Sequence, residues 1–483
     1  MKKNIAVKIF FITLFIFSVI INRQIVAASC SNLEIENYVQ EFMSDNKIPG
    51  MAVYAIKCDQ EILSKGFGFE DDDRPVTCQT LFEIGSNSKA FTAFAISKLA
   101  DEKMLNLNDD ISKYISWLDV YYKGEKQQLT IKNLIEHKSG IPKGMISKIQ
   151  ISSSKSALED TVRVLKGINL KTAPGTKFEY STINYDVLGL VIQNISGMPY
   201  EDYMEANIFK PLGLDETYAG RNVAPKNLVS NGYKLNFCNQ KDYLAPIYRG
   251  NTPAGYIISN INDIGKWLKA QMNLLKDKNF QDENYFFGWF LEKEPTIKFM
   301  HRGINPNFSS FIMFDTDKDI GVAILCNTNN CLLDDFAKGI FSMVDTNDLL
   351  DKTQRKDFNF ILDEICSSIY VVLSFSLLVI VFFMLKIIFQ ICKKERRFSA
   401  FSLKIFYKIL FKLSILGLAA FAVYLIPYLF FQATWDFLFV WFPYTFKHVI
   451  IILFLNFVFL SILLIISSLF KREKQLNNFK MST

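Results

Sequence analysis

The first chemically suggestive feature of this sequence is a serine followed three residues later by a lysine, Ser86 and Lys89. An apolar run follows Lys89, so we expect a helix whose first turn brings the amine beside the hydroxyl. Burial of that turn lowers the pKa of the lysine, and a neutral amine can accept the serine proton. The spacing alone is a weak indication, because Ser44 and Ser152 also stand three residues before a lysine. An isolated pair of this kind is usually a helix N-cap with a solvated lysine.

Two later polar segments could complete such a site. The first, residues 174–189, reads PGTKFEYSTINYDVLG and carries Tyr180, whose phenol could share the serine proton. The second, residues 301–310, reads HRGINPNFSS and leads into a strand, where a backbone N–H can stabilise a developing oxyanion. Taken singly, Tyr180 also fits a core aromatic residue and His301 a packed strand residue.

Composition narrows the chemistry. The chain of 483 residues has three histidines, His137, His301 and His448, which is too few for a zinc site built from histidine clusters. We therefore predict a site without metal or cofactor, expect His137 to be structural, and assign no role to His448. The net charge of +6 arises largely beside apolar segments near the C-terminus, where membrane topology explains it, so nucleic acid is not an expected partner.

The elements that must position these residues indicate an α+β fold. Residues 51–56 and 63–69 alternate like paired strands, residues 81–99 turn helical after Gly85, and residues 311–326 contain two apolar strands separated by the turn-rich DTDKD. Strands at both ends with helices between them predict a sheet assembled from distant segments. Cysteines occur at irregular spacing, so disulfides and free thiols both stay open; they are Cys30, Cys58, Cys78, Cys238, Cys326 and Cys331.

The N-terminus has the pattern of a secretory signal peptide. Lysines precede an apolar run from Ile9 to about Ile21, and Val26, Ala27 and Ala28 provide the small residues of a cleavage site. Two alternatives remain open: an uncleaved anchor, and a lipoprotein attached through Cys30. In each case the segment that follows is exported.

Three uncharged apolar runs near the C-terminus, each about long enough to cross roughly 30 Å of hydrocarbon as a helix, predict a transmembrane domain. Basic residues lie between the first two runs and after the third, which predicts that both segments are cytoplasmic and that the hydrolytic residues lie on the periplasmic face of the cytoplasmic membrane. The predicted segments are a signal peptide 1–28, an extracytoplasmic serine hydrolase domain 29–365, transmembrane helices 366–392, 413–432 and 449–470, a basic cytoplasmic loop 393–412, an extracytoplasmic loop 433–448 and a cytoplasmic tail 471–483.

Three motifs in chain order, S-x-x-K at Ser86, Y-x-T at Tyr180 and H-x-G at His301, resemble the class C β-lactamase and penicillin-binding-protein family of serine hydrolases. The same family is fitted by LTIKNLIEHKSGIP (129–142) and PLGLDET (211–217). The resemblance implies a β-lactamase/transpeptidase-like domain, with an antiparallel sheet flanked by helices, ahead of the three-helix transmembrane domain. Thr182 stands where the family usually has asparagine and Asn307 where it often has glycine, which argues against ordinary β-lactam turnover.

A narrower resemblance accounts for both departures. A class C-like exported domain followed by three spans is similar to the prodrug-activating peptidases of nonribosomal peptide and polyketide pathways, of the colibactin peptidase type. The similarity rests on Glu83 three residues before the serine, a small hydroxyl residue at position 182, and the segments NYDVLG (184–189) and NPNFSS (305–310). Such enzymes remove an N-acyl-D-asparagine cap once the inactive precursor has left the cytoplasm. The resemblance implies a D-amino-acid-specific peptidase of antibiotic biosynthesis, with the N-acylated precursor and the lipid bilayer as partners and the exporter of that precursor as a further candidate.

Residue roles follow from the chemistry and the resemblance together. Ser86 is the expected nucleophile, and Lys89 with Tyr180 is the expected base, which later returns the proton to the leaving amine. The backbone N–H groups of Ser86 and Ile304 are the expected oxyanion hole. The predicted substrate-binding residues are Glu83, Thr182, His301, Gly303 and Asn305.

Two other functions stay open at this point. One is a cell-wall D,D-peptidase or esterase of the same fold, and the other is a catalytically idle membrane sensor that binds β-lactams or peptidoglycan. Loss of Ser86 or Lys89 would mark the idle form, and both residues are present.

Overall fold

The computed structural model describes residues 32–276, 278, 280, 283–346, 356–399 and 402–472. Among these residues, one compact unit runs to Tyr233 and resumes at Asp242–Asp357, while the second consists of Lys234–Lys241 and the chain from Phe358 onward. The predicted signal peptide and Cys30 lie outside the described residues. Every cysteine that the structure describes is a free thiol.

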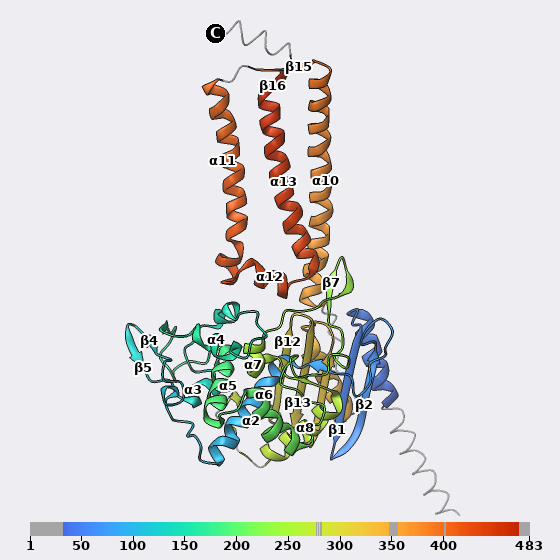
Figure 1. The fold of residues 1–483 in the computed structure, drawn as a ribbon. Coiled ribbons are helices and arrows are strands. Elements are labelled where there is room, and N and C mark those ends of the chain that lie inside the picture. Colours follow the sequence, from blue (N-terminus) through green and yellow to red (C-terminus); the bar gives the residue numbers. More distant parts are fainter. Residues whose placement is uncertain are drawn as a thin grey trace, which may run out of the picture. The chain divides into compact units, whose positions relative to one another are not determined.

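The first unit is built on a seven-stranded antiparallel sheet, in which the strands from the two ends of the unit lie side by side (Figure 1). This confirms the predicted sheet of distant segments. Asp315 ends one strand and accepts hydrogen bonds from the N–H groups of Asp317 and Lys318, which forms the predicted turn. In sheet order the strands are β10 (Tyr285–Phe286), β11 (Trp289–Glu292), β12 (Lys298–Asn305), β13 (Phe308–Asp315), β14 (Ile320–Cys326), β1 (Gly50–Lys57) and β2 (Gln60–Gly68).

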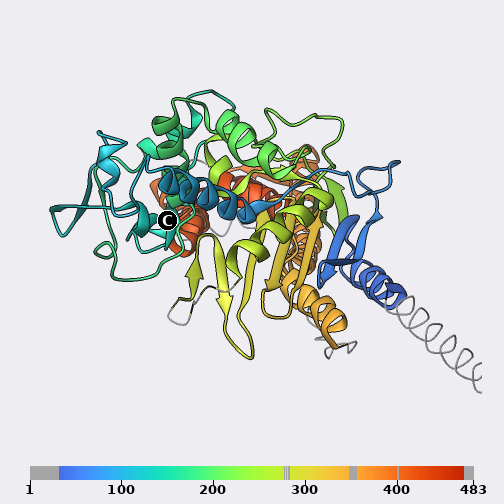
Figure 2. The same cartoon turned by 90° about the horizontal axis from the view of Figure 1, so that it is seen from below.

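The sheet separates two hydrophobic cores, because successive side chains of a strand point to opposite faces. In β1, Ala52, Tyr54 and Ile56 belong to one core, whereas Met51 and Val53 belong to the other. The first core is covered by helices α2 (Ser88–Asp101), α5 (Ile183–Ser196) and α8 (Ile261–Leu275), and the second by a helix over 32–45 and α9 (Leu333–Thr346). Figure 2 shows helices on both sides of the strands.

Helix α2 carries the S-x-x-K motif and is fixed by buried contacts. The Phe91 ring stacks on Trp267 of α8 with ring centroids 3.9 Å apart, and Ile96 and Leu99 are fully buried. The segment before it is not α-helical: residues 82–83 form a short strand, β3, and Gly85–Asn87 form a 3₁₀ turn. The other elements of this unit are β3 (Phe82–Glu83), β4 (Val120–Tyr122), β5 (Glu125–Gln127), β6 (Ile168–Asn169), β9 (Ile258–Ser259), α3 (Ile131–Ile135), α4 (Ala157–Arg163), α6 (Tyr200–Met204) and α7 (Thr252–Gly255).

Within the residues that the structure describes, the second unit contains three helices long and apolar enough to cross a membrane. They cover Phe358–Cys392, Leu403–Phe431 and Tyr444–Leu469, with mean hydropathies of 2.8, 2.3 and 3.2. Many of their large apolar side chains are exposed, which suits contact with lipid rather than with water. The elements of this unit are β7 (Tyr233–Asn236), β8 (Asn239–Asp242), α10 (Phe358–Cys392), β15 (Arg396–Phe398), α11 (Leu403–Ile426), a continuing turn Pro427–Phe431, α12 (Trp435–Trp441), α13 (Tyr444–Leu469) and β16 (Phe470–Arg472).

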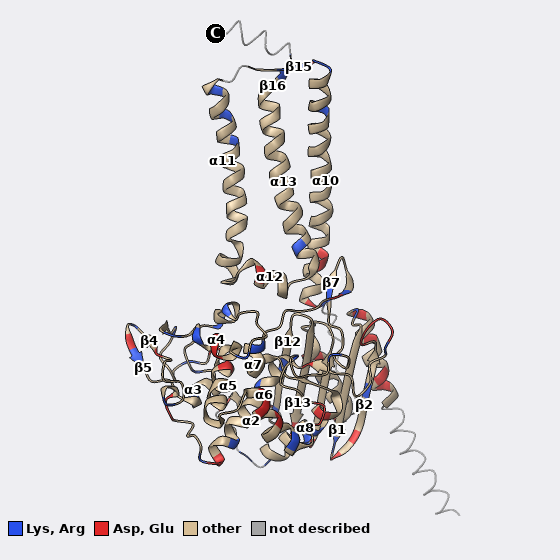
Figure 3. Cartoon of the chain, in the orientation of Figure 1, with Lys and Arg blue, Asp and Glu red and all other residues tan. Residues whose placement is uncertain are grey.

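Charge is distributed unevenly along these helices. Figure 3 shows their middle parts almost free of charged residues, with Lys and Arg gathered toward the end where β15 pairs with β16. Arg396, Arg397, Lys471 and Arg472 lie in that strand pair. The asymmetry is the one on which the predicted orientation rests.

The hairpin of residues 234–241 interrupts the sequence of the first unit and packs within the second unit. The Lys234 ammonium of β7 donates to the carbonyl oxygens of Phe439 and Val440 at 3.0 and 2.9 Å. At the hairpin turn, the N–H of Phe237 donates to the Thr445 hydroxyl at 2.7 Å. The N–H of Cys238 donates to a carboxylate oxygen of Asp363 at 2.6 Å. Residues 234–241 are therefore bonded to elements that follow residue 358.

Candidate active site

Ser86 and Lys89 are in direct contact, as the spacing predicts. The Lys89 amine lies 2.9 Å from the Ser86 hydroxyl oxygen and 2.6 Å from the carbonyl oxygen of Ala254. The side chain is completely buried, and this desolvation lowers the pKa of Lys89 to about 7, with the carboxyl of Asp186 acting in the opposite direction. About half of the amines are then neutral at neutral pH, so Lys89 can take the serine proton.

Two glycines let the nucleophile turn approach strand β12. Gly85 has φ +54°, and a Cβ at this position would lie 2.5 Å from the backbone nitrogen of Ile304. A Cβ at Gly303 would lie 2.0 Å from the carbonyl oxygen of Ile84. Both positions therefore require glycine. The close approach brings the backbone of Ile304 beside the turn that carries Ser86, as an oxyanion hole made of these two residues requires. Gly303 is explained by this packing of the chain on itself, and its contact with substrate stays a prediction.

Tyr180 lies beside the amine. The Lys89 nitrogen is 5.0 Å from the centre of the Tyr180 ring. Burial, the larger effect, raises the pKa of Tyr180, and its hydrogen bond with Ser86 lowers it. The phenol therefore stays protonated at neutral pH, where it can pass a proton on but cannot act as a permanent base.

His137 holds the segment that carries Tyr180. The His137 ring packs 4.3 Å from the Tyr180 ring, and its Nδ1 accepts a hydrogen bond from the N–H of Ser181 at 3.2 Å. The Asn184 amide lies 3.1 Å from the same nitrogen. Burial holds the pKa of His137 well below its usual value, so the ring is neutral. His137 thus positions Tyr180.

His301 lines the same space from β12. Its ring lies 6.0 Å from that of Tyr180, and its Nδ1 lies 2.8 Å from the carbonyl oxygen of Arg302. Burial and the nearby Lys89 lower the pKa of His301 to about 3, so this ring is neutral too. Its buried Nε2 has no hydrogen-bond partner among the described residues, which leaves that atom available to a substrate.

Asp186 is a buried neighbour of Lys89 that sequence reasoning missed. Burial raises the pKa of Asp186 well above its usual value, and the charge of Lys89 acts against this rise. With its amide nitrogen facing the carboxyl group, Asn251 donates to both oxygens of Asp186 at 3.0 Å. The available signal was position alone, since Asp186 lies six residues after Tyr180 in the second polar segment.

Glu83 and Asn305 form a second polar cluster beside the nucleophile turn. The Asn305 amide donates to Glu83 Oε2 at 2.6 Å and to the carbonyl oxygen of Gly255 at 3.0 Å. Arg221, which the sequence did not single out, donates through Nε to Glu83 Oε1 at 2.5 Å. Thr182 is the N-cap residue of α5, and no side-chain hydrogen bond joins it to this cluster in the described part of the chain. The structure thus brings Glu83 and Asn305 together and leaves Thr182 apart.

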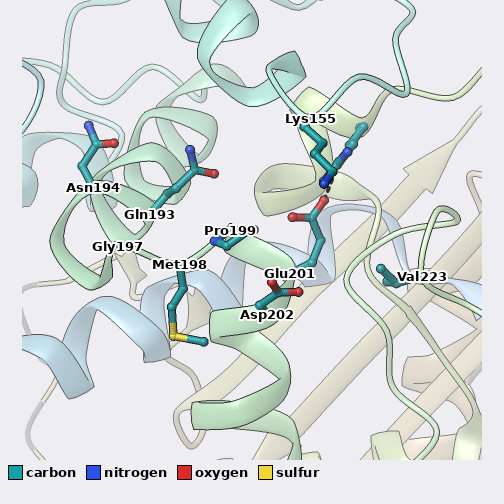
Figure 4. Close-up of a pocket in the computed structure, with 10 residues that line it drawn as sticks. Lys155, Gln193, Asn194, Gly197, Met198, Pro199, Glu201, Asp202 and Val223 are labelled. Atoms are coloured by element: carbon teal, nitrogen blue, oxygen red, sulfur yellow. Dashed lines mark hydrogen bonds and ion pairs between the residues drawn. The ribbon is translucent and has the colours of Figure 1, made fainter.

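Two sizeable cavities open in the first unit. One, of about 760 Å³, is lined by Arg221, Lys226, Asp242 and the apolar segment 244–247. The other, of about 570 Å³, contains none of the predicted site residues; Figure 4 shows Gln193, Asn194 and Glu201 around it. Arg221 both lines the first cavity and bonds to Glu83.

Known proteins share both sequence and fold with this unit. The chain is 33% identical over 318 residues to protein flp of Staphylococcus aureus, covering 62% of this chain and 64% of that protein. It is 33% identical over 194 residues to a putative D-alanyl-D-alanine carboxypeptidase of Salmonella paratyphi B, covering 36% of this chain and 44% of that protein. The chain thus spans less than two thirds of the length of these relatives.

A solved class C β-lactamase has a TM-score of 0.56 to this chain at 21% identity, covering 66% of this chain and 98% of the other, which shows a shared fold. The family model named Beta-lactamase matches residues 35–338. That range includes the sheet, the first hydrophobic core and every predicted site residue from Glu83 to Asn305. Since the matched residues make up more than half of the chain, it belongs to the β-lactamase family of serine hydrolases.

Proposed function

We propose that this protein is a membrane-anchored serine peptidase that removes an N-acyl-D-asparagine cap from an exported nonribosomal peptide or polyketide precursor. The observation that carries the proposal is the buried Glu83 and Asn305 pair next to the nucleophile turn. An asparagine side chain has one acceptor and two donors, so a pocket of carboxylate and amide groups can satisfy it. An alanine side chain can form no hydrogen bond with these groups, so the same pocket favours it less.

The catalytic cycle needs only residues of this chain. The Ser86 oxygen attacks the carbonyl carbon of the cap as its proton passes to neutral Lys89, with Tyr180 beside the same proton. The backbone N–H groups of Ser86 and Ile304 stabilise the oxyanion. The C–N bond then breaks, the proton goes to the leaving amine, and an acyl-enzyme remains. A water molecule, deprotonated by Lys89, hydrolyses this ester and releases the N-acyl-D-asparagine.

The predicted orientation of the membrane helices supports a location of the hydrolase unit outside the cytoplasm. In this proposal the hydrolase unit faces the periplasm and both basic ends of the helices face the cytoplasm. A topology reporter at residue 400 and one at Thr483 then report a cytoplasmic location, and one near Trp435 reports a periplasmic location. A periplasmic C-terminus contradicts the three-span orientation. The bilayer and the exporter of the precursor are the partners that this location implies.

The competing activity is a D,D-carboxypeptidase of the same fold, which the similarity to the putative carboxypeptidase of Salmonella favours. Detergent-solubilised full chain is offered an N-acyl-D-asparaginyl amine and an N-acyl-D-alanyl-D-alanine peptide in one tube, and products are measured by mass spectrometry. We expect cleavage after D-asparagine, none of the L enantiomer, and none with Ser86→Ala.

The matched control for that experiment is Ser44→Ala. Ser44 is exposed and has the same spacing to a lysine, so activity is expected to persist in this variant. Equal rates on the two substrates, or a faster D-alanine reaction, would favour the carboxypeptidase. Binding without turnover of either substrate would favour the idle sensor.

A further inference from the structure

Arg221 contacts the proposed substrate-binding residue Glu83 and takes no part in the catalytic cycle. Its Nε lies 2.5 Å from Glu83 Oε1, while the Asn305 amide occupies the other oxygen, Oε2, at 2.6 Å. The side chains of Glu83 and Arg221 are 1% and 19% exposed. The Arg221 guanidinium also lies 5.6 Å from the centre of the Phe308 ring. Arg221 is thus held from two sides and directed at a buried carboxylate.

A buried carboxylate is costly unless it is paired, and removing one partner of such a pair leaves an uncompensated charge. Arg221 provides that pairing, so the pair has no net formal charge. A carboxylate entering this pocket meets Glu83, and an ammonium group meets Arg221. An uncharged amide avoids both repulsions and can bond to either group.

We infer that Arg221 determines specificity at the Ser86 site by neutralising Glu83, so that the pocket selects an uncharged polar side chain over an acidic or a basic one. The inference rests on the proposed function, in which Glu83 reads the side chain of the cap. Arg221 acts through Glu83 and is therefore a positioning and charge-setting residue. The cavity of about 760 Å³ that it lines leaves space for substitutions at this position.

The inference is tested by removing the charge of Arg221 or of Glu83 and by varying the charge of the substrate side chain. Three N-acyl-D-aminoacyl amines of nearly equal size are compared, carrying D-asparagine, D-aspartate and D-2,3-diaminopropionate. The unmodified enzyme is expected to favour D-asparagine by about 10² in kcat/KM over each charged analogue. Arg221→Met leaves a net negative pocket and moves the preference toward the cationic substrate by at least about tenfold. Glu83→Gln leaves a net positive pocket and moves it toward D-aspartate.

The double variant Glu83→Gln/Arg221→Met is uncharged again, so the preference for D-asparagine returns. The matched control is Arg249→Met. Arg249 forms a similar pair with Glu201 at 2.7 Å, with 15% and 9% exposure, but beside the other cavity. Loss of the same charge at Arg249 is expected to leave the order of the three substrates unchanged. If Arg221→Met does not fold, as judged by thermal unfolding, Arg221→Lys and Glu83→Gln decide the matter: the lysine keeps the original order, while the glutamine shifts it.

The inference is overturned if the substrate order is the same in Arg221→Met, Glu83→Gln and the unmodified enzyme, or if Arg249→Met shifts it equally. Its failure is distinct from failure of the proposed function. Binding of the three compounds to the Ser86→Ala protein, measured by calorimetry, reports charge selection without turnover. An enzyme that binds by charge as described but cleaves only D-alanyl-D-alanine keeps the role of Arg221 and loses the D-asparagine activity.

Discussion

Replacing Lys89 with methionine is expected to abolish turnover and yet stabilise the hydrolase unit at neutral pH. The pKa of Lys89 is lowered from its ordinary value of 10.5 to about 7 because the amine is completely buried. The unfolded chain keeps the ordinary value. The difference between the pKa of Lys89 in the unfolded and the folded chain lowers the free energy of unfolding by about 5 kcal/mol in acid. At pH 7, where half of the folded amines are already neutral, it lowers this free energy by about 4 kcal/mol.

Methionine removes this cost and introduces a smaller one. The carbonyl oxygen of Ala254, now 2.6 Å from the amine, loses its partner, which costs about 1–3 kcal/mol. The methionine side chain is flexible and fills most of the vacated space. The net gain is about 1–3 kcal/mol at pH 7, or roughly 2–6 °C in the melting temperature of a unit of this size. The active site is thus stabilised by removing its base, a usual trade between stability and activity.

The dependence on pH gives the sharper test. Between about pH 7 and 10.5 the unfolded chain binds more protons than the folded one, so the stability of the unmodified protein rises with pH across this window. The methionine variant has no such dependence. The stability gained by the Lys89→Met substitution therefore shrinks as the pH rises. Near pH 10.5 the variant is slightly less stable than the unmodified protein, because the carbonyl oxygen of Ala254 is unpaired.

Thermal unfolding of detergent-solubilised full chain, followed by tryptophan fluorescence at pH 7 and pH 10, measures this difference. Lys98→Met is the matched control, because Lys98 lies on the same helix in an exposed ion pair with Glu102 at 2.9 Å. A change within about 0.5 kcal/mol and without a trend in pH is expected there. A Lys89→Met protein that melts below the unmodified one at pH 7, or a difference that does not change with pH, would refute the reasoning.

Four further outcomes are expected. Initial rates should show kcat/KM rising with pH through about 7, as Lys89 loses its proton. Asp186→Asn should move this rising limb of the pH profile to lower pH, because Asp186 raises the pKa of Lys89. A limb that does not move would show that Asp186 does not affect the pKa of Lys89. Tyr180→Phe should lower kcat by about 10²–10⁴-fold without moving this limb of the pH profile, since the pKa of Tyr180 lies far above it. A shifted limb would indicate that Tyr180 is the base that accepts the Ser86 proton. Thr182→Asn, which restores the usual motif of the family, should weaken D-asparagine cleavage or raise reactivity toward penicillins, and no change in either assay removes Thr182 from the specificity residues. A chain ended at Asp357 should elute as aggregates on size-exclusion chromatography, because Lys234, Phe237 and Cys238 lose the groups that accept their hydrogen bonds. The same shortened chain with residues 234–241 replaced by a short turn should stay monomeric. Equal behaviour of the two shortened chains would argue against a stabilising role for the hairpin contacts.

The sequence was most informative where local patterns determine structure. Alternating residues predicted strands β1 and β2, apolar runs predicted β13 and β14, and the apolar helix after Ser86 correctly indicated a buried first turn. Contacts between distant segments were not predictable in this way. Arg221 meets Glu83 across 138 positions of sequence, and one arginine in a loop has no pattern that indicates a partner. Likewise, no sequence pattern in residues 234–241 indicates that they bond to elements after residue 358.

Three of the S-x-x-K motifs of this chain, at Ser44, Ser86 and Ser152, show why context decides function. Ser44 is exposed, and so is Lys155, the lysine that follows Ser152. Only Lys89 is completely buried, because α2 packs on α8 and the glycines at 85 and 303 let strand β12 close over the turn. Identical spacing thus yields a solvated lysine in one place and an amine with a pKa of about 7 in another. Burial by residues far away in sequence converts a common helical spacing into a base, and the same burial makes the Glu83 carboxylate depend on Arg221.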